Sequence, residues 1–269
     1  DLSFEIFGQT FKAPVFAAPI GAMKLHYGDK YDDLEYNDIL VSACAGTGIA
    51  AFTGDGTNPA VMEGATKAIK AAGGKGIPTV KPWDVNTLAE KFALVKESNA
   101  FACAMDVDAA GLPFLKNLTP PAGSKSAAEL KEIIEKAGVP FILKGIMTVK
   151  GALKAKEAGA SAIVVSNHGG RVLDQCPPTA EVLPEIADAV GKDMKIFVDG
   201  GIRSGVDVFK ALALGADAVL IGRPYVTAVY GGAADGVEAL TAKLISELED
   251  AMAMCGAHSL KEITRDMVR

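Results

Sequence analysis

The chain has 269 residues, 49% of them hydrophobic and 22% charged, and a formal net charge of −6. Such a chain can bury a sizeable core, and its acidic balance argues against a nucleic-acid-binding protein, which needs a face rich in Lys and Arg. No apolar run reaches the roughly 18 residues of a membrane span. The four cysteines form no C-x-x-C pair, so we expect free thiols and no metal site. We therefore predict a cytoplasmic protein without nucleic-acid or membrane partners.

The chain begins with Asp1 instead of Met, so we expect a segment upstream of Asp1 to be missing from the sequence. No secretory leader is visible near the start. The first predicted element is a short apolar hairpin over residues 4–18, with Gly8 at its turn. We expect residues 1–269 to form one domain.

Short apolar runs alternate with longer amphipathic stretches along the chain. Several short runs are continuously apolar, which is typical of parallel strands covered on both faces. We predict eight strands, over residues 14–20, 49–53, 77–81, 101–107, 140–146, 162–166, 195–199 and 218–221. Helices are predicted to begin near residues of helix-capping type, and the last to run over about 235–255. The predicted starts are Asp32, Asn58, Asp84, Ser126, Thr148, Thr179, Ser204 and Asp235.

Eight strands, each followed by a helix, are the count of a (β/α)8 TIM barrel, and a doubly wound sheet is the competing α/β layout. The strand count, the length and the even spacing favour the barrel. One long irregular connection, over residues 112–125, follows the fourth strand. In a barrel this connection would overhang the carboxyl-terminal face, where active sites are built.

Glycine-rich turns follow the seventh and eighth predicted strands, and each turn carries an arginine. Backbone N–H groups, a helix N-terminus and a guanidinium together suit a phosphate dianion. The alternative is two tight turns with surface arginines. The residues of these turns are Asp199, Gly200, Gly201, Arg203, Gly222 and Arg223.

Lys144 ends an otherwise apolar predicted strand. A lysine there either reaches water at the strand mouth or pairs with an anion. In the functional interpretation it is a fixed cation facing a cofactor on which negative charge develops, such as a reduced flavin.

His168 follows the sixth predicted strand, and Arg171 stands three residues later. A planar guanidinium fork suits a carboxylate, so the pair combines a base with a carboxylate clamp. Asp106, at the end of the fourth predicted strand, is our candidate for orienting the imidazole. His26 and His258 have no comparable neighbours in the sequence, and we interpret both as structural.

Residues 166–174 (SNHGGRVLD) resemble the active-site signature of the FMN-dependent α-hydroxy-acid oxidases and dehydrogenases, the family of glycolate oxidase and lactate oxidase. The resemblance continues through residues 198–205 (VDGGIRSG) and 209–216 (FKALALGA). It also covers 221–224 (IGRP) and 259–263 (SLKEI), and residues 18–21 (APIG) are similar to the family's first-strand flavin contact. The resemblance is dense from about residue 140 onward and patchy before it.

This resemblance implies an enzyme that binds FMN across the barrel mouth and oxidises an L-2-hydroxy acid to the 2-keto acid. His168 would be the base, Asp106 its partner, Arg171 the carboxylate clamp, and Lys144 the cation facing N1 and O2 of the flavin. Because family members are often tetramers, we also expect a homotetramer. The implied cofactor-binding residues are Pro19, Ile20, Gly21, Thr53, Lys144, Ser166, Asp199, Gly200, Gly201, Arg203, Gly222 and Arg223.

The chain departs from the family pattern on the substrate side. Thr79 and Lys81 stand where the family has Gln and Tyr, and no arginine occurs between Asp1 and Arg171, so the second substrate arginine is absent. We expect Lys81 to replace part of the carboxylate grip. Two alternatives stay open: an FMN barrel of another reaction class, such as an isomerase or an enzyme of a non-carboxylate substrate, and an FMN-binding barrel that has lost activity.

Overall fold

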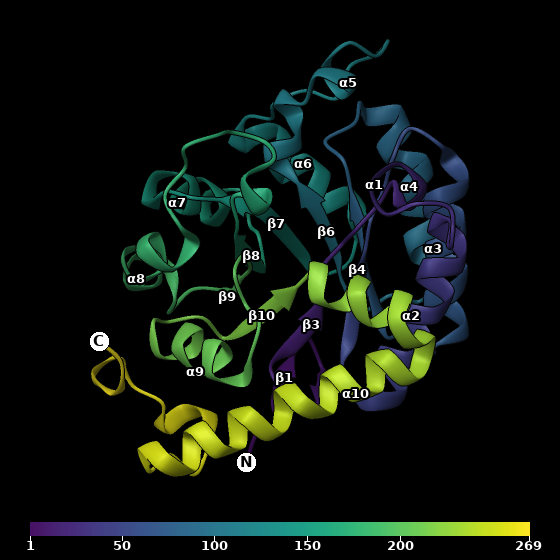
Figure 1. Ribbon diagram of the computed structural model, residues 1–269. Coiled ribbons are helices and arrows are strands. Elements are labelled where there is room, and N and C mark those ends of the chain that lie inside the picture. The colour runs from purple at the N-terminus through teal and green to yellow at the C-terminus, as the bar shows by residue number, and fades with distance from the viewer.

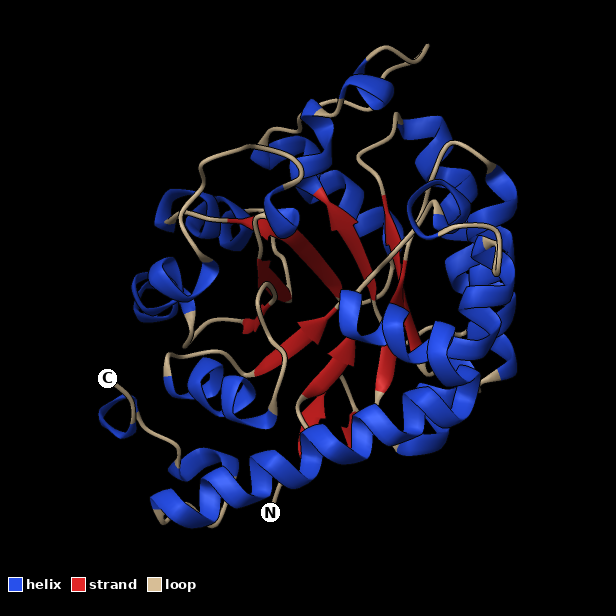
Figure 2. Cartoon of the chain, in the orientation of Figure 1, coloured by secondary structure: helices blue, strands red, loops and turns tan.

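A computed structural model describes residues 1–269 as a closed barrel of parallel strands ringed by helices, with strand order β10-β3-β4-β5-β6-β7-β8-β9 (Figures 1 and 2). The eight predicted strands and the predicted TIM barrel are confirmed. The strands are β3 (Val15–Ala17), β4 (Ala50–Thr53), β5 (Gly76–Val80), β6 (Cys103–Asp106), β7 (Phe141–Ile146), β8 (Ala162–Val165), β9 (Lys195–Val198) and β10 (Ala218–Ile221).

The helices cover the outside of the barrel, so the strands are shielded on both faces. Side-chain caps define several starts: Asp32 with Glu35, Ser126 with Glu129, and Ser204 with Asp207 each form a capping box. The helices are α1 (Met23–Tyr27), α2 (Asp33–Thr47), α3 (Pro59–Ala71), α4 (Val85–Glu97), α5 (Pro113–Lys116), α6 (Ala127–Ala137), α7 (Val149–Glu157), α8 (Thr179–Val190), α9 (Gly205–Ala213) and α10 (Arg223–Cys255).

The predicted last helix, over about 235–255, is found as the second part of α10. Helix α10 runs from Arg223 to Cys255 with a non-helical break at Gly232 and Ala233, and its first part, before this break, was not predicted. Helix α10 packs against α2 and α9 and crosses one side of the barrel (Figure 1). No helix of this structure has the length and apolar character needed to cross a bilayer.

Aromatic side chains fill the barrel interior below its carboxyl-terminal mouth. Phe16, Phe52 and Phe197 meet edge to face at centroid distances of 5.4–6.1 Å. A two-stranded hairpin, β1 (Phe4–Ile6) and β2 (Gln9–Phe11), packs beneath them through Phe4 and Phe11. The predicted hairpin over residues 4–18 is therefore too long, because Val15–Ala17 pairs with the barrel instead. The polar side chains of the barrel therefore lie at the carboxyl-terminal end, opposite the hairpin.

Candidate active site

Alternation along the strands decides which polar side chains enter the barrel. Side chains two residues apart point to the same face of a strand. The apolar interior cluster contains Ile77, Ala104, Ile142, Val164 and Phe197. The residue two positions further along each of these strands is polar, buried and located at the carboxyl-terminal mouth. These residues are Thr79, Asp106, Lys144, Ser166 and Asp199. We call these five residues the mouth ring.

Lys144 lies at the centre of an ionic network in the mouth ring. Its Nζ is 3.6 Å from Oδ2 of Asp199, 3.7 Å from Oδ1 of Asp106 and 3.4 Å from Oγ of Ser166. Burial works against its charge, but the carboxylates outweigh burial and raise the pKa of Lys144. Burial also raises the pKa of Asp199, against the opposing influence of Lys144. Lys144 is thus a fixed, shielded cation, as its functional interpretation requires.

Asp106 lies beside Lys144 because β6 and β7 pair in a register that makes these two residues direct neighbours. Its Oδ2 accepts a hydrogen bond from Nζ of Lys81 at 2.5 Å. Although burial favours the neutral acid, Lys81 and Lys144 hold the pKa of Asp106 well below its usual range. Lys81 itself is positioned through its backbone N–H, which donates to buried Asp55.

His168 contacts Asp108, and the prediction that Asp106 orients the imidazole is wrong. Nδ1 of His168 lies 3.1 Å from Oδ2 of Asp108, whereas Asp106 is engaged by the two lysines. Because an ionised carboxylate only accepts hydrogen bonds, this contact favours the neutral tautomer that has its proton on Nδ1 and its lone pair on Nε2. Asp108 lies in the 3-10 turn Val107–Gly111 that follows β6, so the alternation of the strand gave no signal for it.

The backbone around this pair is specialised. His168 has φ 58°, in the left-handed region that is rare for residues with a side chain. Gly145 has φ 104°, at a register shift in β7, and a Cβ there would lie 2.5 Å from Cγ of Asp108. Because Gly145 has no side chain, Asp108 can lie close to the backbone of β7.

Arg171 is exposed beyond the mouth, and its guanidinium approaches an imidazole. Its NH2 group lies 3.1 Å from Nε2 of His26, on the short helix α1. His26, which we interpret as structural, therefore has a charged neighbour that the sequence did not indicate. Because 145 residues separate the two in the chain, local sequence signals could not have indicated this contact.

The two glycine-rich turns lie where the sequence placed them. Gly200 and Gly201 have φ 95° and 78° and lead into α9, while Gly222 precedes α10. Arg203 donates to the neighbouring carbonyl of Ile202, and a Cβ on Gly169 would lie 3.4 Å from the guanidinium of Arg223. Two helix N-termini and two exposed arginines therefore flank one side of the mouth, and this arrangement suits a phosphate.

The first two barrel strands, β3 and β4, differ in what they contribute to the candidate site. Pro19, Ile20 and Gly21 follow β3 at the mouth, and a Cβ on Gly54 would lie 2.9 Å from the carbonyl of Ile20. The orientation of Thr53 does not fit the prediction that this residue binds the cofactor. Phe52 fills the barrel interior, so alternation turns Thr53 toward the surrounding helices.

The mouth ring fits the polar edge of an FMN ring. Oγ1 of Thr79, Oδ1 of Asp106 and Oδ1 of Asp199 are buried and have no hydrogen-bond partner within the protein. Buried polar atoms are normally hydrogen-bonded. An isoalloxazine edge offers both donors and acceptors, and a fixed cation at Lys144 favours the negative charge that reduction places on the ring. The residues at the mouth are therefore of the right kind to hold FMN.

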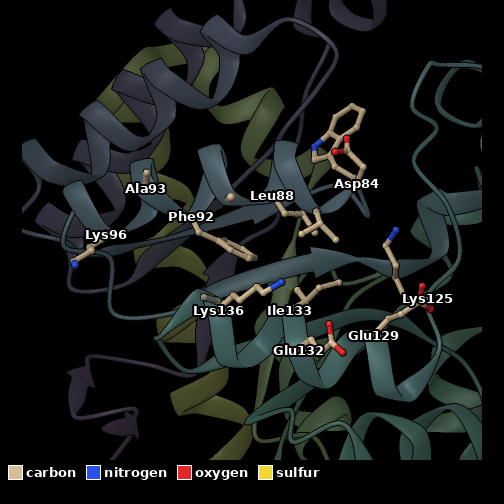
Figure 3. A pocket seen from close by; sticks show the side chains of 14 residues that line it. Asp84, Leu88, Phe92, Ala93, Lys96, Lys125, Glu129, Glu132, Ile133 and Lys136 are labelled. Atoms are coloured by element: carbon tan, nitrogen blue, oxygen red, sulfur yellow. The ribbon is translucent and has the colours of Figure 1, made fainter.

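A separate groove of about 540 Å³ lies on the outside of the barrel between α4 and α6 (Figure 3). Leu88, Phe92 and Ile133 form its apolar floor, and charged side chains such as Lys96 and Lys136 surround it. It contains no residue of the predicted site, so we do not assign the chemistry to this groove.

Comparison with known proteins gives one family match: the FMN-dependent dehydrogenase family matches residues 114–269. Among curated relatives, a peroxisomal (S)-2-hydroxyacid oxidase of Arabidopsis thaliana is 49% identical over 131 residues, which are 49% of this chain and 36% of the relative. An L-lactate oxidase of Lactobacillus jensenii is 36% identical over 207 residues, 75% of this chain and 51% of the relative. The chain thus spans about a third to a half of the curated relatives it matches.

Solved structures are similar over nearly the whole chain. A crystal structure of mandelate oxidase superposes with a TM-score of 0.83 at 30% identity, covering 98% of this chain and 81% of the other. A mandelate oxidase variant bearing an FMN adduct gives a TM-score of 0.82 at 30% identity, covering 98% and 82%.

Proposed function

Since the chain belongs to the FMN-dependent dehydrogenase family, we propose that it oxidises an L-2-hydroxy acid to the corresponding 2-keto acid. The proposal depends most on one contact, that of His168 Nδ1 with Asp108 Oδ2 at 3.1 Å, made at the same mouth as buried Lys144. A base held by a carboxylate and a shielded cation are the two groups that this oxidation needs from the protein.

FMN, when bound, would accept the two electrons together with the hydrogen of the carbinol carbon. Lys144, Thr79 and Ser166 would hold the ring edge from inside the barrel. The phosphate would lie against the N-termini of α9 and α10, near Arg203 and Arg223. The backbone of residues 19–21 and 199–201 would complete the cofactor site.

His168 would take the hydroxyl proton of the substrate on Nε2. Its Nδ1–H donates to Asp108, which fixes the ring and stabilises the imidazolium that forms. The side chain of His168 is 24% exposed, so a substrate can reach it. Asp108 is therefore a positioning residue in this account, and it takes the role that the sequence assigned to Asp106.

The substrate carboxylate would be bound by Arg171, with Lys81 as a second cation. Arg171 is exposed, pairs with no carboxylate of the protein and contacts only the imidazole of His26, so its guanidinium fork suits a bidentate contact with a substrate carboxylate. Lys81 is already paired with Asp106, so its charge is partly neutralised. We therefore expect Arg171 to supply most of the affinity for the carboxylate.

The proposal is tested on the purified protein by its visible spectrum and by anaerobic addition of L-lactate, glycolate and L-mandelate. We expect a flavin spectrum that is bleached by at least one of these acids. The D-enantiomers of lactate and mandelate serve as matched controls and should leave the flavin oxidised. A bound flavin that no 2-hydroxy acid reduces would contradict the proposed reaction.

We also propose a homotetramer, on the basis of the family resemblance, located in the cytoplasm, where reducing conditions suit the four free cysteines. Light scattering of the purified protein tests the first point, since a tetramer has four times the 27.8 kDa of the chain. Imaging of a tagged protein in its native cell tests the second.

A further inference from the structure

Asp106 is a shielded carboxylate held between two lysines. Its Oδ2 accepts from Lys81 at 2.5 Å, and its Oδ1 lies 3.7 Å from Nζ of Lys144. Only 4% of its side chain is exposed, and Oδ1 has no hydrogen-bond donor in the protein. The mouth ring therefore contains a negative charge directly beside its central cation, at the end of the barrel that fits FMN.

The protein keeps this carboxylate charged. Burial alone would favour the neutral acid, but the two ammonium groups outweigh burial and lower the pKa of Asp106 well below its usual range. Charges so shielded from water interact more strongly than charges at the surface. Lys144 is thus flanked by Asp106 on one side and by Asp199, at 3.6 Å, on the other.

We propose that Asp106 lowers the reduction potential of the FMN bound at this mouth, and that Lys81 limits the effect by pairing with the carboxylate. Reduction adds two electrons and one proton to FMN and leaves the ring with one more negative charge. That charge is favoured by Lys144 and opposed by Asp106. A flavin in this site would therefore be harder to reduce than one facing Lys144 alone.

The inference uses the FMN site of the proposed function but not its substrate. The potential of the bound flavin is measured with dithionite and a reference dye under anaerobic conditions, without any hydroxy acid. A protein that binds no FMN would therefore count against the proposed site as a whole. A protein that binds FMN with unchanged potentials in the variants below would count against this inference alone.

The test compares Asp106→Asn, Lys81→Met and the unaltered protein, each purified with FMN bound. Asp106→Asn should raise the equilibrium constant for reduction at least tenfold, which is ~30 mV for a two-electron couple. Lys81→Met should shift the potential in the opposite direction, because it leaves the carboxylate without its closest partner. Asp188→Asn is the matched control, since Asp188 pairs with Arg265 at the surface, and it should leave the potential unchanged.

Opposite shifts distinguish electrostatic tuning from a loss of structure, which would move both variants in one direction. Equal potentials in all four proteins, or a fall in Asp106→Asn, would overturn the inference. If Asp106→Asn does not retain FMN, Lys81→Met decides alone: a lower potential supports the inference, and an unchanged or higher one overturns it. Circular dichroism and flavin content establish that each variant is folded and loaded.

Discussion

At the scale of single residues, the orientation of His168 depends on Asp108. The carboxylate accepts from Nδ1 and fixes the proton there, so Nε2 is the nitrogen that faces a substrate. The two residues come from different strand ends, and His168 holds the unusual φ of 58°. The surrounding fold must therefore maintain a strained turn to keep the pair aligned.

Replacing Asp108 with Asn should lower turnover of the reactive 2-hydroxy acid by about 10²-fold or more, because a neutral amide stabilises the imidazolium less well. Bound FMN should be retained, and kcat is the quantity to measure. Asp193→Asn is the control, since Asp193 pairs with Lys156 at the surface. Full activity in Asp108→Asn would show that Asp108 does not assist the reaction.

The pairing of Asp106 also predicts how stability depends on pH. Its folded pKa is lowered, so its contribution is present above the unfolded value of ~3.9 and is lost as the pH falls toward the folded pKa. Asp106→Asn leaves buried Lys144 and partly buried Lys81 underpaired and should cost about 3 kcal/mol near pH 7.

Urea unfolding at a series of pH values tests this expectation. The difference in unfolding free energy between Asp106→Asn and the unaltered protein should narrow below about pH 4. Asp188→Asn, at an exposed surface pair, is the control for general effects of acid. A difference that is the same at low and neutral pH would mean that ionised Asp106 adds nothing to stability.

At the scale of elements, the register of neighbouring strands builds the site. The pairing of β6 with β7 sets Asp106 beside Lys144, and the shift in β7 at Gly145 gives Asp108 its space. Helices α9 and α10 add their N-termini behind the glycine turns. No single element carries the chemistry, so a small backbone change in one strand should affect residues on another.

Gly145→Ala is the sharpest test of this dependence. The new Cβ would clash with Asp108, and φ 104° is unfavourable for alanine, so we expect a stability loss of about 1–3 kcal/mol. Turnover should fall at unchanged FMN content, because Asp108 moves away from His168. Thermal unfolding and kcat are the measurements.

Gly46→Ala is the control for this substitution. Gly46 lies in α2 with open space around its Cα, so alanine there should be neutral or slightly stabilising. If Gly145→Ala behaved like this control in both measurements, the close approach of β7 to Asp108 would affect neither stability nor turnover.

At the scale of the whole molecule, the two ends of the barrel are chemically distinct. The hairpin β1–β2 covers the amino-terminal end, three phenylalanines fill the interior, and the charged mouth ring lies at the carboxyl-terminal end. Ligand access is therefore confined to the carboxyl-terminal face, as is usual for this architecture.

Much of this arrangement could be predicted from the sequence because its signals are local. Apolar runs marked the strands, capping residues such as Ser126 and Ser204 marked helix starts, and glycines marked the turns after β9 and β10. Contacts between distant residues could not be predicted this way. The Arg171–His26 contact and the choice of Asp108 over Asp106 depend on three-dimensional register, which no local pattern encodes.

The most direct test of the account is the anaerobic rate of flavin reduction by the reactive 2-hydroxy acid, measured by stopped flow. His168→Gln should bind FMN and be reduced normally by dithionite, yet react with the acid about 10²–10⁴-fold more slowly. His258→Gln, at an exposed histidine near the carboxyl terminus, should match the unaltered protein. An unchanged rate in His168→Gln would contradict the assignment of His168 as the base.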